Sequence, residues 1–432
     1  MSKKENKYPS LLVISINAWS DSNSVGNTIS NQFGGWDKSK LSNLYLRNEE
    51  IDNDRCSVYF RICDKDVIKS LFTGKDLGVE LQYKENKTQS KKPVNRKQSF
   101  FNLLVQIRPT FILILRELLW CFGFNKKDKL NDFLKKQNPE IIHIHCPHLI
   151  YGHRVLHYCK KVTNAKIVVF FGDELHGYKN FWPLYSIYQL ILRHWIKKTI
   201  KISDVNYAVT KELCNYYSGI FGREFKLLYK GAIILPPIQK SHVKPYKMVY
   251  AGNLLYDRWR VLALISKAIE SVSEEQDLFE LHIYSATPLT KEMNQKLNTK
   301  NSTVKGAIPF NEVKRKLSDA DIVLHVEAFN KSSIRLTKYS FSTKIVDIIE
   351  SGSCVMGVGP SELASINFLK QSGSAIVANS FEDICTQLRK IINEEGLIYQ
   401  NQLNMYNYAK NIFDLNFVRN KLYNDISEIL HK

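Results

Sequence analysis

Short apolar segments recur along the whole chain in two successive series, separated by stretches with helical periodicity. The segments are rich in Val, Ile and aromatic residues and are continuous rather than alternating, which is typical of strands buried on both faces of a parallel sheet. Strands that alternate with helices predict an α/β fold. We expect the first series of strands at residues 11–17, 57–62, 140–145, 165–171 and 205–210, and the second at 247–252, 279–285, 320–327, 353–359 and 374–379.

The length of the chain indicates two domains. The chain has 432 residues, and a single core rarely grows past about 250–300 residues. Between the two series, the segment GAIILPPIQKSHVKPY contains the prolines and polar residues expected of a linker. We therefore predict two Rossmann-like domains facing a cleft, one at residues 1–238 and the other at 239–405.

The charge of the chain favours a polyanionic partner. It has 61 Lys and Arg against 42 Asp and Glu, a formal net charge of +19. Such an excess suits nucleic acid or an anionic membrane, or it reflects a generally basic, solvated surface. Nucleic acid is not expected, because the sequence contains no helix-turn-helix, zinc-finger or aromatic RNA-binding pattern.

Several features predict a cytoplasmic protein. The 8 cysteines include no C-x-x-C pair, which fits free thiols in a reducing compartment. The start, MSKKENKYPS, is polar and does not resemble a signal peptide. No apolar run reaches the roughly 18–20 residues of a membrane span.

Two segments of the first predicted domain suit a membrane surface. The basic segment 84–98 precedes an apolar stretch at 100–124, and residues 181–201 combine aromatic and basic side chains. Aromatic rings and long basic side chains are typical of helices that lie in a bilayer interface. We therefore predict peripheral binding to the anionic inner face of the cytoplasmic membrane. The alternative is that these aromatic residues pack in the core of the first domain.

Residues that directly follow the strands are the first candidates for a site, because open parallel sheets bind ligands beyond the carboxyl ends of their strands. After the first strand, Ser24, Gly26 and Asn27 lie where a helix should begin. Small residues there let backbone amides approach an anion, so Gly26 and Asn27 are predicted to bind the donor and Ser24 the acceptor. The dinucleotide pattern G-x-G-x-x-G is absent, and an ordinary turn is the alternative.

The first strand of the second series is followed by a second candidate. Gly252 and Asn253 end the strand, and Arg258 precedes an apolar helix. A guanidinium in this position suits a diphosphate, which accepts bidentate hydrogen bonds. The helix dipole slightly disfavours a cation at this end, so a functional reason for Arg258 is favoured over a merely solvated side chain.

A third candidate opens the helix KIVDIIESG. Ser342 and Thr343 can cap this helix, and its free amides together with Lys344 can bind a phosphate. Asp347 lies three residues further along the same face and can accept hydrogen bonds from a ribose diol. The alternative is an ordinary capped helix with a surface aspartate.

A cluster of histidines raises the question of a metal. His143 and His145 alternate on a strand, and His153 and His157 are four residues apart on a predicted helix. No carboxylate lies near them in sequence, so no metal is predicted. His148, in the loop between strand and helix, is assigned to the acceptor instead.

Several of these segments resemble one known family. The matching pieces are SVGNT, PEIIHIH, VNYAVT, KMVYAGNLLYDRW, VKGAIPFNEVKRKLSDADIVLHVE and YSFSTKIVDIIESGSCVMGVGPSELA, which together span nearly the whole chain. In this order they resemble the GT-B glycosyltransferases, most closely the bacterial family 4 group. The resemblance implies a first domain for the acceptor, a second for a nucleotide sugar, and a C-terminal helix of about 406–432 that packs back on the first domain. It further implies sugar transfer to an acceptor hydroxyl, with the departing diphosphate stabilised by Arg258 and Lys344.

The resemblance also suggests the biological setting. The acceptor is expected to be a lipid-linked saccharide of a surface polysaccharide, and no cofactor besides the nucleotide sugar is expected.

The sequence departs from this family at two places. Of the two family glutamates about eight positions apart, the second falls on Asp347 and the first on Tyr339, so Glu327 is the candidate for the contact with the donor sugar. The family histidine of the first domain is missing, and Asp173 is the acidic candidate near the acceptor. Two alternatives remain: a sugar-nucleotide epimerase of the same fold, or a non-catalytic module that binds nucleotide sugars, which Tyr339 favours.

Overall fold

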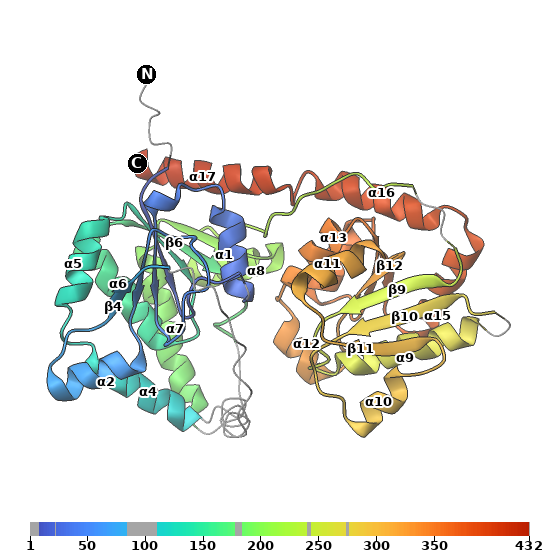
Figure 1. Ribbon diagram of the computed structural model, residues 1–432, viewed down its shortest axis with the longest axis horizontal. Helices are drawn as coiled ribbons and strands as arrows, with labels where there is room; N and C mark the ends of the chain where they lie inside the picture. Colours follow the sequence, from blue (N-terminus) through green and yellow to red (C-terminus); the bar gives the residue numbers. More distant parts are fainter. Residues whose placement is uncertain are drawn as a thin grey trace, which may run out of the picture. The chain divides into compact units, whose positions relative to one another are not determined.

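The computed structural model describes two compact units. It covers residues 8–21, 23–83, 110–177, 184–239, 243–273 and 276–431, without the side chains of Phe310 and Thr343. Unit 1 comprises Met1–Leu228 and Lys421–Lys432, and unit 2 comprises Tyr229–Asn420. In each unit, helices flank a mostly parallel sheet (Figure 1). The predicted fold class, with two Rossmann-like units, is confirmed.

The sheet of unit 1 is built around a fully buried central strand. Among the described residues it has eight strands in the order β4-β3-β2-β1-β5-β6-β7-β8, all parallel to their neighbours except β4. Every residue of the central strand β1 is buried, and Leu11 pairs with both Leu41 and Ile141. Because this strand is covered on both faces, its sequence LLVIS is continuously apolar up to its last residue. The strands are β1 Leu11–Ser15, β2 Leu41–Tyr45, β3 Val58–Arg61, β4 Val79–Leu81, β5 Ile141–His145, β6 Lys166–Phe171, β7 Val205–Ala208 and β8 Lys226–Leu227.

The helices of unit 1 begin and end where local sequence dictates. The N-cap of α8 is Thr210, whose side chain accepts a hydrogen bond from the amide of Leu213 at 3.0 Å. The same helix ends at Gly222, whose φ of 62° suits a residue without a side chain. The described helices are α1 Ser24–Phe33, the 3-10 helix η1 Lys38–Lys40, α2 Asp64–Thr73, α4 Thr110–Gly123, α5 Asp128–Gln137, α6 Ile150–Thr163, α7 Tyr185–Ile202 and α8 Lys211–Phe221.

The last helix, α17 (Leu415–His431), joins unit 1 from Lys421 onward. Its Asp425 accepts hydrogen bonds from the Tyr207 hydroxyl and the Lys226 ammonium, each at 2.6 Å. These bonds fix the C-terminal part of α17 against strands β7 and β8.

Unit 2 contains an entirely parallel sheet. Among the described residues it has six strands in the order β11-β10-β9-β12-β13-β14, with α9 and α15 on one side and α11 and α13 on the other (Figure 1). The strands are β9 Tyr246–Ala251, β10 Phe279–Tyr284, β11 Ser302–Gly306, β12 Ile322–Val326, β13 Cys354–Val358 and β14 Ile376–Ala378. The helices are α9 Arg258–Val272, α10 Lys291–Leu297, α11 Phe310–Ser318, α12 Lys331–Thr337, α13 Thr343–Glu350, α14 Ala364–Gln371, α15 Phe381–Asn393 and α16 Leu397–Ala409.

The boundary between the units lies earlier than the sequence pattern suggests. The predicted boundary is residue 238, whereas the division falls after Leu228. The reason is that the following residues pack on unit 2: the Tyr229 ring lies 4.8 Å from the Phe413 ring, and the amide of Ala232 donates to the Phe413 carbonyl at 2.6 Å.

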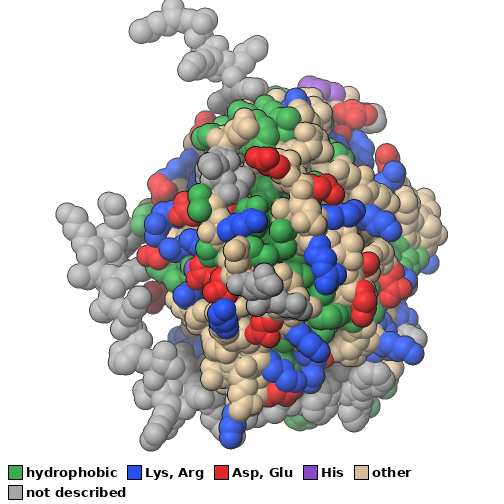
Figure 2. Space-filling model, turned by 90° about the vertical axis from the view of Figure 1, so that its right-hand side faces the viewer, with side chains coloured by type: hydrophobic (Ala, Val, Ile, Leu, Met, Phe, Trp, Pro, Cys, Tyr) green, Lys and Arg blue, Asp and Glu red, His purple; other side chains and the backbone are tan. Residues whose placement is uncertain are grey.

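The surface carries mixed charges. On the face shown in Figure 2, Lys and Arg side chains are interspersed with Asp and Glu, so the net charge of +19 does not form one continuous basic patch there. All eight cysteines are described, and each is a free thiol.

Apolar side chains are exposed on α2, α4 and α7 of unit 1, and on α4 they include Phe111 and Phe122 of the predicted apolar stretch 100–124. The expected Phe181 and Trp182, and the whole of 84–109, lie outside the described residues. Tyr188 is buried in the core, and Trp195 is half-buried beside the His157 ring. The exposed apolar residues of α7 are instead aliphatic: Leu184, which precedes the helix, and Ile187, Leu190 and Ile191. None of the helices that the structure describes is long and apolar enough to cross a membrane.

Candidate functional site

Two cations and a carboxylate meet at the carboxyl edge of the unit 2 sheet. Arg258 is the first residue of α9, Lys344 is the second residue of α13, and Glu327 follows β12. The Nη2 atom of Arg258 donates to both carboxylate oxygens of Glu327, at 3.1 and 3.0 Å. The two side chains are only 15% and 5% exposed. This charge-assisted contact fixes the guanidinium.

Glycine at position 252 lets the Lys344 ammonium lie against the end of β9. A Cβ atom on Gly252 would lie 2.5 Å from Lys344 Nζ, closer than any side chain allows. The next residue, Asn253, accepts a hydrogen bond from Arg258 Nη1 at 3.1 Å through its side-chain oxygen. The structure thus brings together Gly252, Asn253, Arg258, Glu327 and Lys344, which were predicted from four separate segments.

The electrostatics of this cluster favour an anion. Burial raises the pKa of Glu327 against the lowering effect of Arg258 and Lys344. Burial and the neighbouring Arg258 lower the pKa of Lys344, while Glu327 and Asp347 oppose that shift. Burial, with Arg258 and Lys344, lowers the pKa of His325 to about 3, so its imidazole is neutral at pH 7. One carboxylate therefore faces two cations, and the excess positive charge suits a diphosphate.

The start of α13 differs in part from the prediction. Ser342 occupies the N-cap position, but its side chain makes no capping hydrogen bond, so the expected cap is not formed. The side chain of Thr343 lies outside the described residues. Asp347 has a partner that the sequence analysis missed: its Oδ1 atom accepts from Lys230 Nζ at 2.7 Å.

Unit 1 contains a pocket of about 200 Å³ at the carboxyl ends of β1, β5 and β6. Three predicted residues from separate segments line it: Gly26, His148 and Asp173. The sequence analysis missed Trp19, which follows β1, and the lining role of His145. Burial lowers the pKa of His145 to about 3, so this ring is also neutral at pH 7. For reference we call this hollow the acceptor pocket, after His148 and Asp173, two of the residues that were predicted to lie near an acceptor.

The amides of Gly26 and Asn27 have hydrogen-bond partners at the start of α1, which corrects the reason given for these two residues. The amide of Gly26 donates to the Asn23 side chain at 2.7 Å, and the amide of Asn27 donates to the Asn23 carbonyl at 2.9 Å. Glycine is required at position 26 for packing, since a Cβ atom would lie 2.1 Å from the Ser20 carbonyl oxygen. Ser24, predicted to bind the acceptor, is exposed and does not line the pocket.

One member of the histidine cluster, His153, is held by hydrogen bonds within unit 1. Both ring nitrogens of His153 are hydrogen-bonded, Nδ1 with Thr199 Oγ1 at 2.8 Å and Nε2 with the Pro147 carbonyl at 3.0 Å. Among the residues that the structure describes, no group of three or more His, Cys, Asp or Glu side chains is placed to hold a metal ion.

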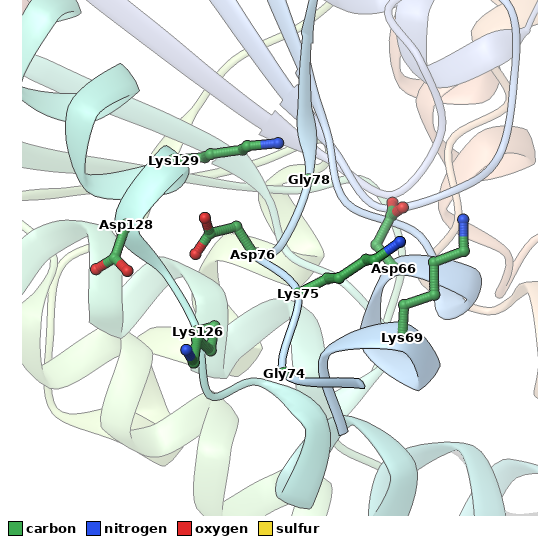
Figure 3. Close-up of a pocket in the computed structure, with 9 residues that line it drawn as sticks. All are labelled: Asp66, Lys69, Gly74, Lys75, Asp76, Gly78, Lys126, Asp128 and Lys129. Carbon is green, nitrogen blue, oxygen red and sulfur yellow. The ribbon is translucent and has the colours of Figure 1, made fainter. Parts of the chain in front are cut away.

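Another hollow of unit 1, of about 420 Å³, does not involve any predicted residue (Figure 3). Four lysines and three aspartates line it, and Figure 3 shows Lys75 pointing toward Asp66 and Asp76 lying between Lys126 and Lys129. Its charges are therefore mixed, because four cations lie among three carboxylates.

A buried carboxyl group lies behind the acceptor pocket. The Oε1 atom of Glu117, on α4, accepts from the amide of Ile150 at 2.8 Å and from the Tyr188 hydroxyl at 3.4 Å. The other oxygen is buried without a partner among the described residues. Burial raises the pKa of Glu117 to about 7.

This shift predicts a pH dependence of stability. Because the folded pKa lies above the ordinary glutamate value of 4.5, the native state holds the proton more tightly, and stability should fall as pH rises from about 4.5 to 7. Glu117→Gln mimics the protonated form, so the variant should match the wild type at pH 5 and unfold at higher temperature at pH 8.5. Thermal unfolding of both proteins across this pH range tests the prediction. An equal difference in unfolding temperature between variant and wild type at both pH values would contradict the raised pKa of Glu117.

Known structures, rather than known sequences, resemble this chain. No model of a protein family matches it, and no curated protein matches it significantly. Anabaena HepE, solved with UDP, is 9% identical with a TM-score of 0.61, covering 97% of this chain and 100% of that one. A glycosyltransferase from Rickettsia africae is 13% identical with a TM-score of 0.58, covering 98% and 99%. Sucrose-phosphate synthase from Thermosynechococcus elongatus is 10% identical with a TM-score of 0.58, covering 98% and 99%. The chain therefore has the GT-B fold, built from two Rossmann-like units.

Proposed function

We propose that the protein is a glycosyltransferase of the family 4 type, which moves a sugar from a nucleotide-diphosphate sugar to an acceptor hydroxyl. The observation that carries this proposal is the pair of half-buried cations, Arg258 and Lys344, at the starts of two helices beside Gly252. Structures of HepE with UDP and with UDP-glucose support a nucleotide sugar as the ligand of this fold.

The residues of unit 2 are proposed to have different roles in binding the donor. Arg258 and Lys344 bind the diphosphate and stabilise the charge that develops as it departs, because preorganised charges in a water-poor site need no reorganisation. Glu327 holds Arg258 and lies where the donor sugar is proposed to bind. Lys230 binds only Oδ1 of Asp347, so Oδ2 is proposed for the ribose diol.

Unit 1 is proposed to hold the acceptor. The acceptor pocket offers Asp173 and His148 beside apolar side chains such as Trp19. Asp173 is proposed to accept the proton of the attacking hydroxyl. No metal and no cofactor are proposed, because the two cations neutralise the diphosphate.

Binding of the donor is the first test. Thermal unfolding in the presence of UDP-, GDP-, ADP- and TDP-sugars should show stabilisation by one class, since a ligand that binds only the native state raises the unfolding temperature. The shift, and sugar transfer to an acceptor extract, are expected to persist in EDTA. Loss of both in EDTA, with recovery in Mn²⁺ or Mg²⁺, would contradict the metal-independent mechanism.

The same experiment separates the two alternatives. An epimerase would convert the sugar nucleotide without any acceptor, whereas a binding module would be stabilised by it and release no nucleotide. A transferase releases the nucleoside diphosphate only when an acceptor is present.

Peripheral binding to the cytoplasmic membrane, in surface polysaccharide assembly, is proposed for the setting. The exposed side of α7 is apolar at Ile187, Leu190 and Ile191 in its first half and basic at Lys197 and Lys198 in its second half. Such a helix can place its apolar half among lipid chains and its cations at the anionic headgroups.

Vesicle flotation tests this setting. The protein should float with anionic vesicles at low salt and dissociate at high salt, because headgroup attraction is screened. Ile187→Gln with Leu190→Gln should weaken flotation. The exposed Lys331→Ala on unit 2 is a control that should not. Protein that stays unbound at low salt would contradict membrane binding.

A further inference from the structure

A further hollow of unit 1, of about 360 Å³ and distinct from the acceptor pocket and the hollow of Figure 3, carries three cations. Arg47 follows β2, Lys65 belongs to the first turn of α2, and Arg116 projects from the middle of α4. Two acids, Glu49 and Asp64, also line it. We call it the basic hollow.

The basic hollow adjoins the acceptor pocket through Glu49. One carboxylate oxygen of Glu49 accepts from the Asn17 side chain at 3.0 Å, and the other accepts from the amide of Ala18 at 2.9 Å. Asn17 and Ala18 line the acceptor pocket. The two hollows are therefore separated only by this hydrogen-bonded contact.

The acids of the basic hollow do not neutralise all of its cations. The Oδ1 atom of Asp64 accepts from Arg116 Nε at 3.0 Å and from Trp120 Nε1 at 2.7 Å. The carboxylate of Glu49 is held by Asn17 and Ala18, as described. Within the part of the chain that the structure describes, neither Arg47 nor Lys65 makes an ion pair. Since Arg47 is half-buried, its guanidinium is partly removed from water and favours an anionic ligand.

The two helices that contribute Lys65 and Arg116 to the basic hollow, α2 and α4, also carry exposed apolar side chains. Helices α2 and α4 pack in close contact, since a Cβ atom on Gly123 would lie 2.5 Å from a methyl carbon of Val67. The two helices lie next to each other in Figure 1. Their outer sides carry the apolar face, which we define as the exposed residues Ile68, Leu71 and Phe72 of α2 and Phe111, Ile112, Leu115, Leu118 and Phe122 of α4.

We propose that the acceptor is a lipid that carries a phosphate group. The phosphate lies in the basic hollow between Arg47, Lys65 and Arg116, the lipid chain covers the apolar face, and the sugar reaches the acceptor pocket. The order of a hydroxyl-binding pocket, a cation cluster and an apolar surface matches the order of groups in a phosphate-linked glycolipid. A partner protein would cover the apolar face without needing uncompensated cations beside the pocket. The part of this inference that concerns the sugar rests on the proposed transferase function.

Vesicle binding can test the phosphate site directly. The full chain is titrated with phosphatidylcholine vesicles that contain phosphatidylglycerol, whose phosphate links the lipid to a hydroxylated headgroup, and with vesicles of equal charge that contain oleate, which has no phosphate. Tighter binding to phosphatidylglycerol is expected. Arg47→Ala should weaken that binding at least tenfold, and Leu115→Gln should weaken binding to both vesicles. Lys129→Ala, in the mixed-charge hollow of Figure 3, is the matched control and should leave binding unchanged.

Each other outcome overturns the inference. Equal binding to both vesicles would mean that charge alone attracts the protein. Unchanged binding by Arg47→Ala would remove the phosphate from the basic hollow, and full release by 10 mM inorganic phosphate would indicate a site for free phosphate. Stabilisation by the donor nucleotide sugar, measured on the same Arg47 variant, should equal that of the wild type. This control shows that the variant is folded, and it keeps a failure of the lipid site distinct from a failure of the transferase proposal.

Discussion

Lys344→Ala is expected to weaken binding of the donor nucleotide sugar and to slow transfer by at least tenfold, or about 1.4 kcal/mol for each factor of ten. The ammonium is held beside Gly252 and next to Arg258, so its loss removes one of two charges that meet the diphosphate. Steady-state kinetics with varied donor concentration, together with direct titration of the nucleoside diphosphate, measure both effects. Lys338→Ala is a matched control, because Lys338 is exposed and lies in the same segment.

The pH profile provides a second measure of Lys344. Since burial and Arg258 lower the pKa of Lys344, its ammonium loses its proton at a lower pH than an ordinary lysine. Donor affinity should therefore decline on the alkaline side before pH reaches about 10.4, the usual value for lysine, and Lys344→Ala should lack this decline. Unchanged kinetics in Lys344→Ala, or an identical pH profile, would show that the diphosphate binds elsewhere.

The strands that the sequence identified are those whose residues are apolar on both faces, such as β1 and β12. The sequence analysis missed β2, because its sequence LSNLY contains Ser42 and Asn43. Asn43 is 0% exposed, yet its side chain donates to the Val13 carbonyl at 2.9 Å and to Ser15 Oγ at 3.0 Å. Both partners lie on the neighbouring strand, so only the tertiary structure shows that a buried amide is satisfied there.

The Arg258 cluster was predictable because Gly252 and Glu327 directly follow strands, where parallel sheets bind ligands, and because Arg258 and Lys344 are cations at helix starts. The partner of Asp347 was not predictable, since Lys230 lies 117 residues away in sequence. The sequence also could not predict which side of α7 faces the core. This helix is apolar over much of its circumference, so periodicity could not decide that Tyr188 faces the core while Leu190 is 63% exposed.

The ion pair of Arg258 with Glu327 predicts a loss of stability as well as of activity. Arg258→Ala should slow transfer at least tenfold and leave Glu327, which is 5% exposed, as a buried carboxylate without its guanidinium. Removing one partner of a buried ion pair typically costs about 3–5 kcal/mol. Without Arg258, the folded pKa of Glu327 should rise further above the ordinary glutamate value of 4.5. The variant should then be most stable at low pH and lose stability as pH rises through that folded pKa.

A second substitution separates the two roles of Arg258. Glu327→Gln in the Arg258→Ala background removes the buried charge, so it should restore most of the thermal stability at pH 8 but none of the donor binding, because the cation is still missing. The double-mutant cycle compares the wild type, both single variants and the double variant. For each protein, unfolding temperatures are measured at pH 5 and pH 8, together with a donor titration. If the double variant recovers donor affinity together with stability, Arg258 acts only by supporting the fold, and the diphosphate must be bound by Lys344 and the helix amides alone.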